Sequence, residues 1–351
     1  MPAVAAVILA RHADALFWVG RYLERTEATV RCLDYAANSI IHLRSDEARI
    51  EVEQLIKTLG LESVAAPLGS LGGRRQLFAF LLSDTANPGS VLSAVTAIRE
   101  RLRSTRERIP IELWEEANGL YLRFREFGDI ELPPERLHET LLMVRRACLA
   151  ISGVLNEGMR RDEGYEFILI GRMIERSVFT VGLLVAGYTD PRGAIDATRM
   201  LRLTSSLQAY HRRHGHAPDP EGVVRYLLAG TDLPRSVLSC LLRAEESLRG
   251  VGSVAGALDG PRRRAGLLRA RLELGEIEEA MAQEPLPVLS ELHWDLTEVA
   301  SEIAAGVVPP LGFPTASSEY LRPGGARWDA GPMPAGPSAE PGRGLSPEID
   351  P

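Results

Sequence analysis

The chain has 351 residues, 45% of them hydrophobic, and a formal net charge of −7. That much apolar sequence can bury a substantial core, which excludes a chain that is disordered throughout. The acidic balance argues against a nucleic-acid partner and against an anionic membrane, because both kinds of binding need a basic surface.

Targeting and metal signals are weak. Residues 1–7 form an apolar N-terminal extension without the basic segment of a signal peptide, and the longest apolar stretch, 178–188, is too short to span a bilayer. A di-iron bundle needs two Glu-x-x-His motifs and two further glutamates, and the sequence has one such motif, Glu135-x-x-His138. The three cysteines lie far apart. We therefore expect a cytoplasmic protein with no metal and no cofactor.

Apolar residues recur at helical spacing almost throughout, and no segment has the alternation of a strand, so the sequence predicts an all-α fold. The first half predicts six helices, five of them near residues 14–41, 46–59, 74–82, 88–102 and 134–155 and the sixth opening at Pro110. Loops rich in Pro and Gly separate them at 67–73 and 128–134.

The second half predicts a similar succession. Helices are expected near residues 165–185, 200–210, 226–228, 234–249, 263–281 and 287–303. From 307 to 351 prolines and glycines crowd the sequence and aliphatic residues are few, which predicts a disordered tail.

Two motifs occur twice in the same order. Gly20-Arg21-Tyr22-Leu23-Glu24-Arg25 returns as Gly171-Arg172-Met173-Ile174-Glu175-Arg176, an offset of 171 − 20 = 151 residues. A second pattern, L-L-x-x-T-x-x-P-x-S-V-L-S, places Pro88 opposite Pro234, an offset of 234 − 88 = 146 residues. The helical domain, 8–306, is therefore predicted to be a bundle of two tandem pseudo-repeats of about 150 residues, 8–155 and 156–306.

Each copy of the first motif places an arginine, a glutamate and a second arginine on one helix face: Arg21, Glu24 and Arg25 in the first copy, Arg172, Glu175 and Arg176 in the second. Strongly apolar neighbours, Trp18 among them, indicate that each cluster faces the interior or the seam between the halves. Gly20 and Gly171 would allow another backbone to approach closely at that level.

Two interpretations of these clusters stay open. Buried ion pairs can fix how two helices cross, with more effect on specificity than on net stability. Alternatively, the arginines line a pocket and hold a carboxylate or phosphate.

The second copy differs from the first in its surroundings. Arg161, Asp162 and Glu163 precede it, a denser charged run than the one before the first copy. If one half carries chemistry, we expect it here, with Glu175 and Asp162 as candidate acid and base groups. The other interpretation is a solvated helix start, where carboxylates are favourable.

Several segments resemble the bacterial alpha-E superfamily over roughly residues 8–305, with Tyr165 where that family usually has tryptophan. The matching segments, in order, are Ile8-Leu9-Ala10-Arg11, Leu16 to Glu27, Asn87-Pro88-Gly89-Ser90-Val91, Arg99-Glu100, Leu113-Trp114-Glu115, Arg161-Asp162-Glu163-Gly164-Tyr165, Gly171-Arg172, Glu175-Arg176 and Leu233-Pro234-Arg235-Ser236-Val237.

The resemblance implies an all-α domain that works beside a circularly permuted ATP-grasp ligase and a transglutaminase-like protein. Members of that family are typically encoded next to such proteins or fused to them, which implies a role in peptide or amide ligation. This chain resembles a stand-alone member, and we expect it to bind the ligase, or its acidic or peptidic substrate, through the Arg-Glu-Arg clusters. An enzyme of the same pathway and a purely structural scaffold are the alternatives. The oligomeric state is not predicted.

Overall fold

The structure is a computed structural model, and it describes residues 8–39, 43–69, 74–125, 134–193, 195–252 and 255–307. The extension 1–7, the tail from residue 308 and most of the predicted break 128–134 lie outside these residues. Every regular element of the described part is a helix, which confirms the all-α prediction.

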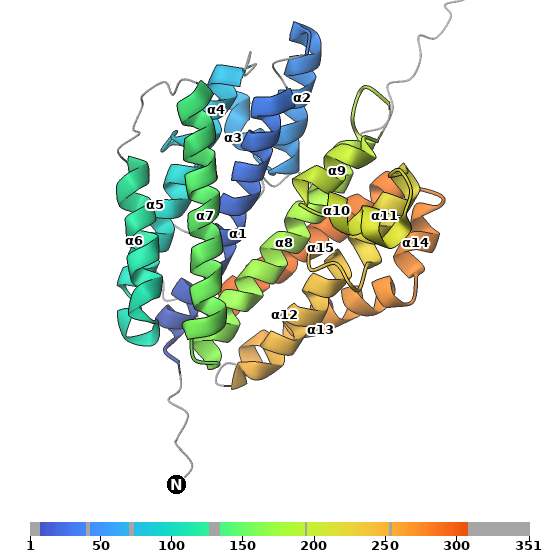
Figure 1. Cartoon of the computed structure of the whole chain (residues 1–351). Coiled ribbons are helices and arrows are strands. Elements are labelled where there is room, and N and C mark those ends of the chain that lie inside the picture. The colour runs from blue at the N-terminus through green and yellow to red at the C-terminus, as the bar shows by residue number, and fades with distance from the viewer. Residues whose placement is uncertain are drawn as a thin grey trace, which may run out of the picture.

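The first half contains seven α-helices and two short 3₁₀ segments within the described residues (Figure 1). They are α1 (Ala10–Ser39), α2 (Ser45–Thr58), α3 (Glu62–Ala65), η2 (Ala66–Leu68), α4 (Arg74–Leu82), α5 (Val91–Arg103), η3 (Arg106–Arg108), α6 (Ile111–Arg125) and α7 (Pro134–Gly158).

Eight further helices follow in the described second half. They are α8 (Glu163–Tyr188), α9 (Ala197–Leu203), α10 (Leu207–His214), α11 (Pro220–Ala229), α12 (Val237–Gly250), α13 (Ala255–Glu273), α14 (Glu276–Met281) and α15 (Pro285–Val307).

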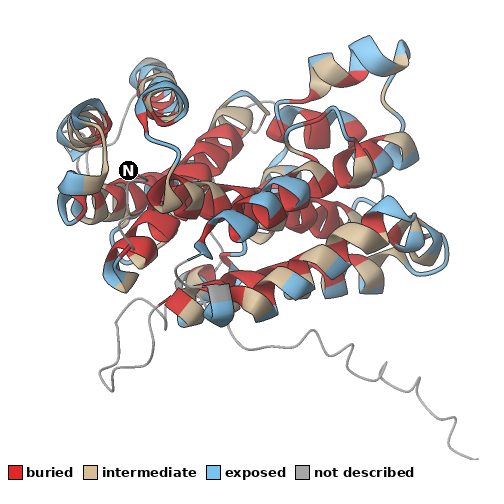
Figure 2. Ribbon diagram, turned by 90° about the horizontal axis from the view of Figure 1, so that it is seen from below, coloured by how far each residue is buried: buried red, intermediate tan, exposed pale blue. Residues whose placement is uncertain are grey.

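The long helices α1 and α8 cross at the centre, with α2 to α7 on one side and α9 to α14 on the other (Figure 1). Helices α5 and α7 pack against α1, whereas α12 and α15 pack against α8. Buried residues run along both central helices, and the outer helices carry the exposed faces (Figure 2). The core therefore lies at the contact between the two halves, where the repeated motifs are.

Two predicted helices are each broken into two. The segment 200–210 splits after α9, where Ser205 has a left-handed φ of 54° and the hydroxyls of Thr204 and Ser206 bond to backbone carbonyls. Such side-chain bonds compete with the helix ladder. The segment 263–281 splits at Gly275, whose φ of 79° favours glycine.

The repeated prolines precede helices α5 and α12 and do not begin them, because a serine after each proline is the N-cap. Ser90 Oγ accepts from the Ser93 backbone N–H, and Ser236 Oγ from that of Ser239, both at 3.1 Å. Helices α5 and α12 therefore begin after these N-caps. Pro88 and Pro234 lie in the preceding turns, not in the first helical turn as predicted.

The described surface carries no feature of a membrane span or a metal centre. No described helix has an apolar stretch of the length that a bilayer crossing needs. Among the same residues, no group of three or more His, Cys, Asp and Glu side chains could hold a metal ion.

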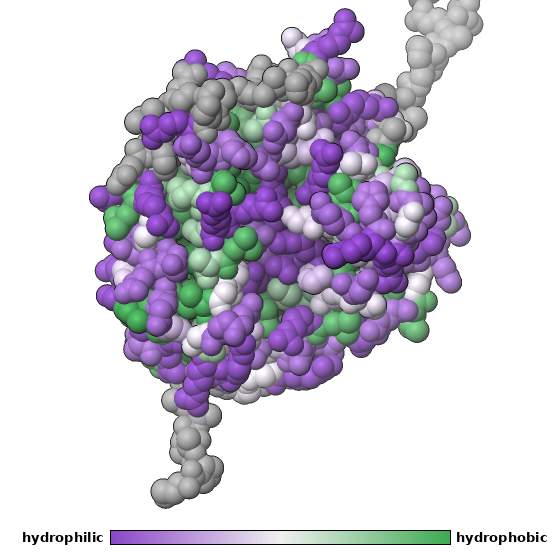
Figure 3. Space-filling view, viewed as in Figure 1, coloured by the Kyte–Doolittle hydropathy of each residue, from purple (hydrophilic) through white to green (hydrophobic). Residues whose placement is uncertain are grey.

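One face of the molecule is hollowed between α7 and α8, and hydrophilic side chains gather there (Figure 3).

Candidate functional site

The two repeated glycines form the point where α1 and α8 touch. A Cβ on Gly20 would lie 2.0 Å from the carbonyl oxygen of Ile168, and a Cβ on Gly171 would lie 2.1 Å from that of Phe17. Only glycine permits this approach, because both clashes are with backbone. The two contacts are reciprocal: each glycine meets the carbonyl three residues before the other. The close approach predicted at these positions is present.

The carboxylates pair across this crossing, each with the arginines of the other helix. Glu24 on α1 binds Arg172 and Arg176 on α8, and Glu175 on α8 binds Arg21 and Arg25 on α1. The sequence predicted that each Arg-Glu-Arg set lies together on one helix face. In the structure the glutamate of each set binds the arginines of the other set. Glu24 and Glu175 are thus each paired with arginines of the opposite helix.

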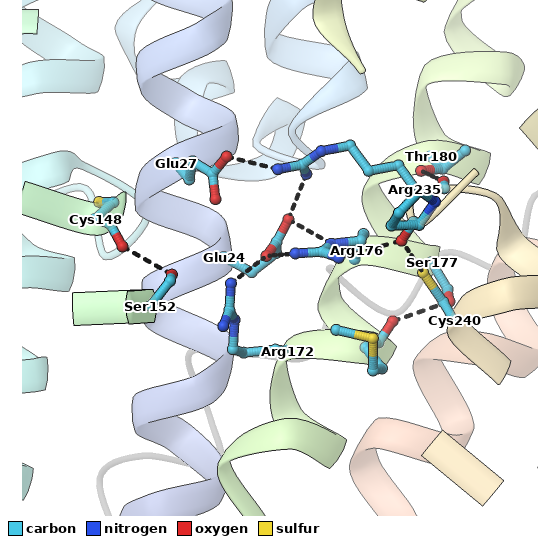
Figure 4. Close-up of polar contacts among 12 residues, drawn as sticks. Glu24, Glu27, Cys148, Ser152, Arg172, Arg176, Ser177, Thr180, Arg235 and Cys240 are labelled. Carbon is cyan, nitrogen blue, oxygen red and sulfur yellow. Dashed lines mark hydrogen bonds and ion pairs between the residues drawn. The ribbon is translucent and has the colours of Figure 1, made fainter. Parts of the chain in front are cut away.

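Glu24 is closed off from solvent by three arginines (Figure 4). Its Oε1 accepts from Arg176 Nε at 2.9 Å and from Arg235 Nη1 at 2.7 Å, and its Oε2 accepts from Arg176 Nη2 at 2.7 Å. Arg172 is more distant, at 3.8 Å. Arg235 also donates to Glu27 at 2.6 Å. Glu24 is 1% exposed, so its carboxylate is buried within this network of arginines.

Glu175 has fewer partners and a different environment. Arg21 donates from Nε to Oε2 at 2.7 Å, and Arg25 donates from Nε to Oε1 at the same distance. Arg21 also lies over the Trp18 ring, with its Cζ 5.0 Å from the ring centroid, which holds the guanidinium in place. Two cations thus face one anion.

A pocket of about 120 Å³ lies beside Glu175. Arg21, Arg25 and Glu175 line it, and the exposed residues Gly60 and Ser63 lie at its edge. The side chain of Arg25 is 19% exposed. The charged set at Glu175 therefore adjoins a pocket, whereas the side chain of Glu24 is almost fully buried.

The electrostatics keep both glutamates ionised. Burial raises the pKa of Glu175, but the charges of Arg21 and Arg25 outweigh it and lower that pKa below its ordinary value. Burial likewise raises the pKa of Glu24, and Arg176, Arg235 and Arg172 hold it well below the ordinary value. A carboxylate held in this way is a poor proton acceptor at neutral pH.

The sequence did not single out His293, which lines the same pocket from α15. Burial lowers the pKa of this imidazole, and the nearby Glu175 opposes the shift only in part. The imidazole is therefore neutral at pH 7 and can both donate and accept a hydrogen bond. No local motif marks it, because it comes from a helix more than 100 residues after Glu175 in the chain.

Arg235 was also missed as a site residue, although a signal was present. In the second repeated motif it stands where the first copy has Gly89, the residue after the repeated proline. This difference between the copies could have shown that the two clusters are built differently.

The charged run before the second motif lies elsewhere. Asp162 is the N-cap of α8 and accepts from the backbone of Gly164, while Arg161 donates to carbonyls at the end of α7. Glu163 accepts from the backbone N–H of Ile8 at 3.2 Å. Asp162 precedes Glu175 by 13 residues, about 20 Å along a helix, so the structure does not bring these two together.

Trp114, which belongs to one of the segments that resemble the family and for which we expected a structural role, lies on α6. The guanidinium of Arg106 lies over its ring, 4.7 Å from the centroid, and that of Arg99 at 5.8 Å. This aromatic contact joins η3, α5 and α6 and has no part in the pocket.

The relatives of this chain are longer proteins. Uncharacterized proteins of Mycobacterium bovis and of two Mycobacterium tuberculosis strains are each 26% identical to it over 332 residues. The match covers 86% of this chain but 37% of each relative, so the chain spans little more than a third of their length. No solved structure is significantly similar. The family profile that matches residues 8–306 is described as a predicted alpha-helical domain with a conserved ER motif, and the chain belongs to this family, Alpha-E.

Proposed function

We propose that this chain is the binding component of an amide-ligation system, in which it works with an ATP-grasp ligase and holds a carboxylate-bearing substrate or partner segment beside Glu175. The observation that carries the proposal is the excess of one positive charge at a pocket: Arg21 and Arg25 face the single carboxylate Glu175. Arginine suits a carboxylate because its planar fork donates two parallel hydrogen bonds.

The ligase is supported by the family resemblance, in which such domains accompany ATP-grasp and transglutaminase-like proteins. The relatives add support of a different kind, since they carry the matching segment within a longer chain. We propose that the additional activities reach this chain by association with separate proteins.

The test is a binding measurement between the full chain and an ATP-grasp ligase encoded beside it, by biolayer interferometry. Arg25→Ala should weaken the association at least tenfold if the pocket takes part, because Arg25 is the more exposed of the two arginines. Arg49→Ala is the matched control, since Arg49 forms an exposed pair with Glu53 on α2. Absence of association, or equal affinity of the two variants, would reject the proposal.

A second candidate function is catalysis in the same pocket. His293 favours it, because a neutral imidazole beside a carboxylate is a possible proton acceptor. Here Glu175 would position the imidazole or the substrate, and Asp162 has no part. His293→Gln separates the two candidates: binding without turnover in this variant supports catalysis, and unchanged ligation supports binding alone.

A further inference from the structure

Two charged side chains at the Glu24 site have uncharged counterparts at the Glu175 site. The offsets between the repeated motifs pair Arg235 with Gly89 and Glu27 with Val178. At the Glu24 site, Arg235 bridges Glu24 Oε1 and Glu27 Oε1 at 2.7 and 2.6 Å. Gly89 and Val178 both line the pocket beside Glu175. The pocket therefore corresponds to the space that an Arg–Glu ion pair fills on the other side.

One contact is equivalent at the two glutamates, whereas their Oε2 atoms differ: Glu24 Oε2 accepts from Arg176 and Glu175 Oε2 from Arg21. Glu24 Oε1 accepts from Arg176 Nε, and Glu175 Oε1 accepts from Arg25 Nε, the equivalent atom. Glu24 Oε1 then accepts a second bond, from Arg235. At Glu175 no described side chain takes the place of Arg235, although a carboxylate oxygen can accept two hydrogen bonds. This oxygen can take a cationic donor from a ligand.

A threonine shows the same difference. Thr180 donates its hydroxyl to the carbonyl oxygen of Arg235 at 3.2 Å. Its counterpart Thr29, 151 residues earlier, is 1% exposed and lines the pocket, and its hydroxyl has no hydrogen-bond partner in the described part of the chain. A buried hydroxyl without a partner is costly, so a ligand oxygen here would be stabilised.

A group in the position of Glu27 would also find donors. Glu27 accepts from Arg31 at 2.8 Å, and the counterpart of Arg31 is Gly182. A Cβ on Gly182 would lie 3.4 Å from His293 Nε2, so the imidazole lies near the place that the Arg31 side chain takes in the other site. Arg25, Thr29 and His293 together offer donors for one carboxylate.

We infer that the pocket binds the zwitterionic head of a free α-amino acid such as glycine, whose ammonium takes the place of Arg235 against Glu175 and whose carboxylate takes the place of Glu27. The Arg235–Glu27 pair is neutral as a whole, and so is a zwitterion. The pocket volume of about 120 Å³ accommodates such a head group. This inference rests on the proposed function and names the substrate class at its site.

The test compares three probes by NMR titration of the full chain: glycine, acetate and methylammonium. Glycine should bind at least tenfold more tightly than either of the others, because it alone satisfies both ends of the pocket. Acetate as tight as glycine would overturn the inference and leave an anion site, with the proposed function intact. Absence of glycine binding would also overturn it, and the ligase association then decides the proposed function separately.

Two variants make the inference specific. Val178→Glu supplies the missing carboxylate from the protein, so glycine affinity should fall at least tenfold while methylammonium affinity rises. Leu149→Glu, on the exposed face of α7, is the matched control and should change neither. Thr29→Val removes the hydroxyl without a charge and should weaken glycine at least threefold. Unchanged glycine affinity in both pocket variants would overturn the inference.

Discussion

The contact between α1 and α8 can be tested by adding one carbon atom. In Gly171→Ala the new Cβ would lie 2.1 Å from the carbonyl oxygen of Phe17, whereas ordinary contacts begin at 3.4 Å. No side-chain rotation relieves this overlap, because the clash is with backbone. The helices must move apart by about 1 Å, which strains the ion pairs that cross the same contact.

The net effect is the difference of two terms. Overpacking costs about 1–3 kcal/mol, and the upper end applies where backbone has to move. Alanine stabilises a helix by about 1 kcal/mol relative to glycine, because its helix propensity is higher. We therefore expect Gly171→Ala, and likewise Gly20→Ala, to lower the free energy of unfolding by about 2 kcal/mol, or the melting temperature by about 3 °C for a folded part of about 300 residues.

The assay is thermal and urea unfolding followed by circular dichroism, with Gly153→Ala as control. Gly153 lies in α7, and no described atom lies within 4 Å of the place that an added Cβ would take, so the same substitution there should stabilise by up to about 1 kcal/mol. The double variant Gly20→Ala, Gly171→Ala should cost less than the sum of the two, because one separation of the helices accommodates both carbons. A Gly171→Ala protein as stable as the parent would refute the reasoning.

Three further predictions follow from the site. Glu24→Gln should lower the free energy of unfolding by about 3–5 kcal/mol, since it leaves several buried guanidiniums without a full counter-charge. Glu175→Gln should lower it by less, since the pocket beside Glu175 admits water. Equal urea midpoints of the two variants would contradict this. Because burial lowers the pKa of His293, the unfolded chain takes up this proton first, and its contribution to stability is full above about pH 6.5 and is lost as the pH falls below it. His293→Gln should flatten that part of the curve of urea midpoint against pH, and an unchanged slope would count against it. Arg235→Ala should be destabilised, and millimolar methylguanidinium should raise its melting temperature more than that of the parent chain, because the variant offers this cation a second site beside Glu24; an equal rise in the two proteins would show that the vacated space does not hold a guanidinium.

Helical periodicity was enough to predict the fold class and most helix positions, because the apolar stripes of α1, α8 and α12 follow local spacing. It failed where side chains compete with the backbone ladder, at Thr204 to Ser206, and where a left-handed glycine ends a helix at Gly275. The two-repeat organisation of the whole chain stays a prediction, although the contacts at the central crossing are reciprocal.

The motif predicted that charge would gather at the seam, but not how the charges pair. Spacing along one helix cannot show that Glu24 binds arginines of α8, because this depends on how closely Gly20 and Gly171 let the helices cross. His293 reaches the Glu175 site from α15, and no local pattern connects it to the motifs. Arg235 reaches the Glu24 site from the turn before α12, and its only signal was the difference from Gly89 within the second repeated motif.

The exchange of partners between the central helices has a consequence for how the chain is made. Glu24 and Arg235 are separated by 211 positions in the sequence. At about 5–20 residues per second, a ribosome needs about 10–40 s to add that length. Arg176 follows Glu24 by 152 positions, so for most of this interval α1 carries a carboxylate whose counter-charges have not yet been synthesised. We expect the first half to remain open until the second emerges, so the order of translation, and not only the final packing, bears on whether this protein reaches its native state.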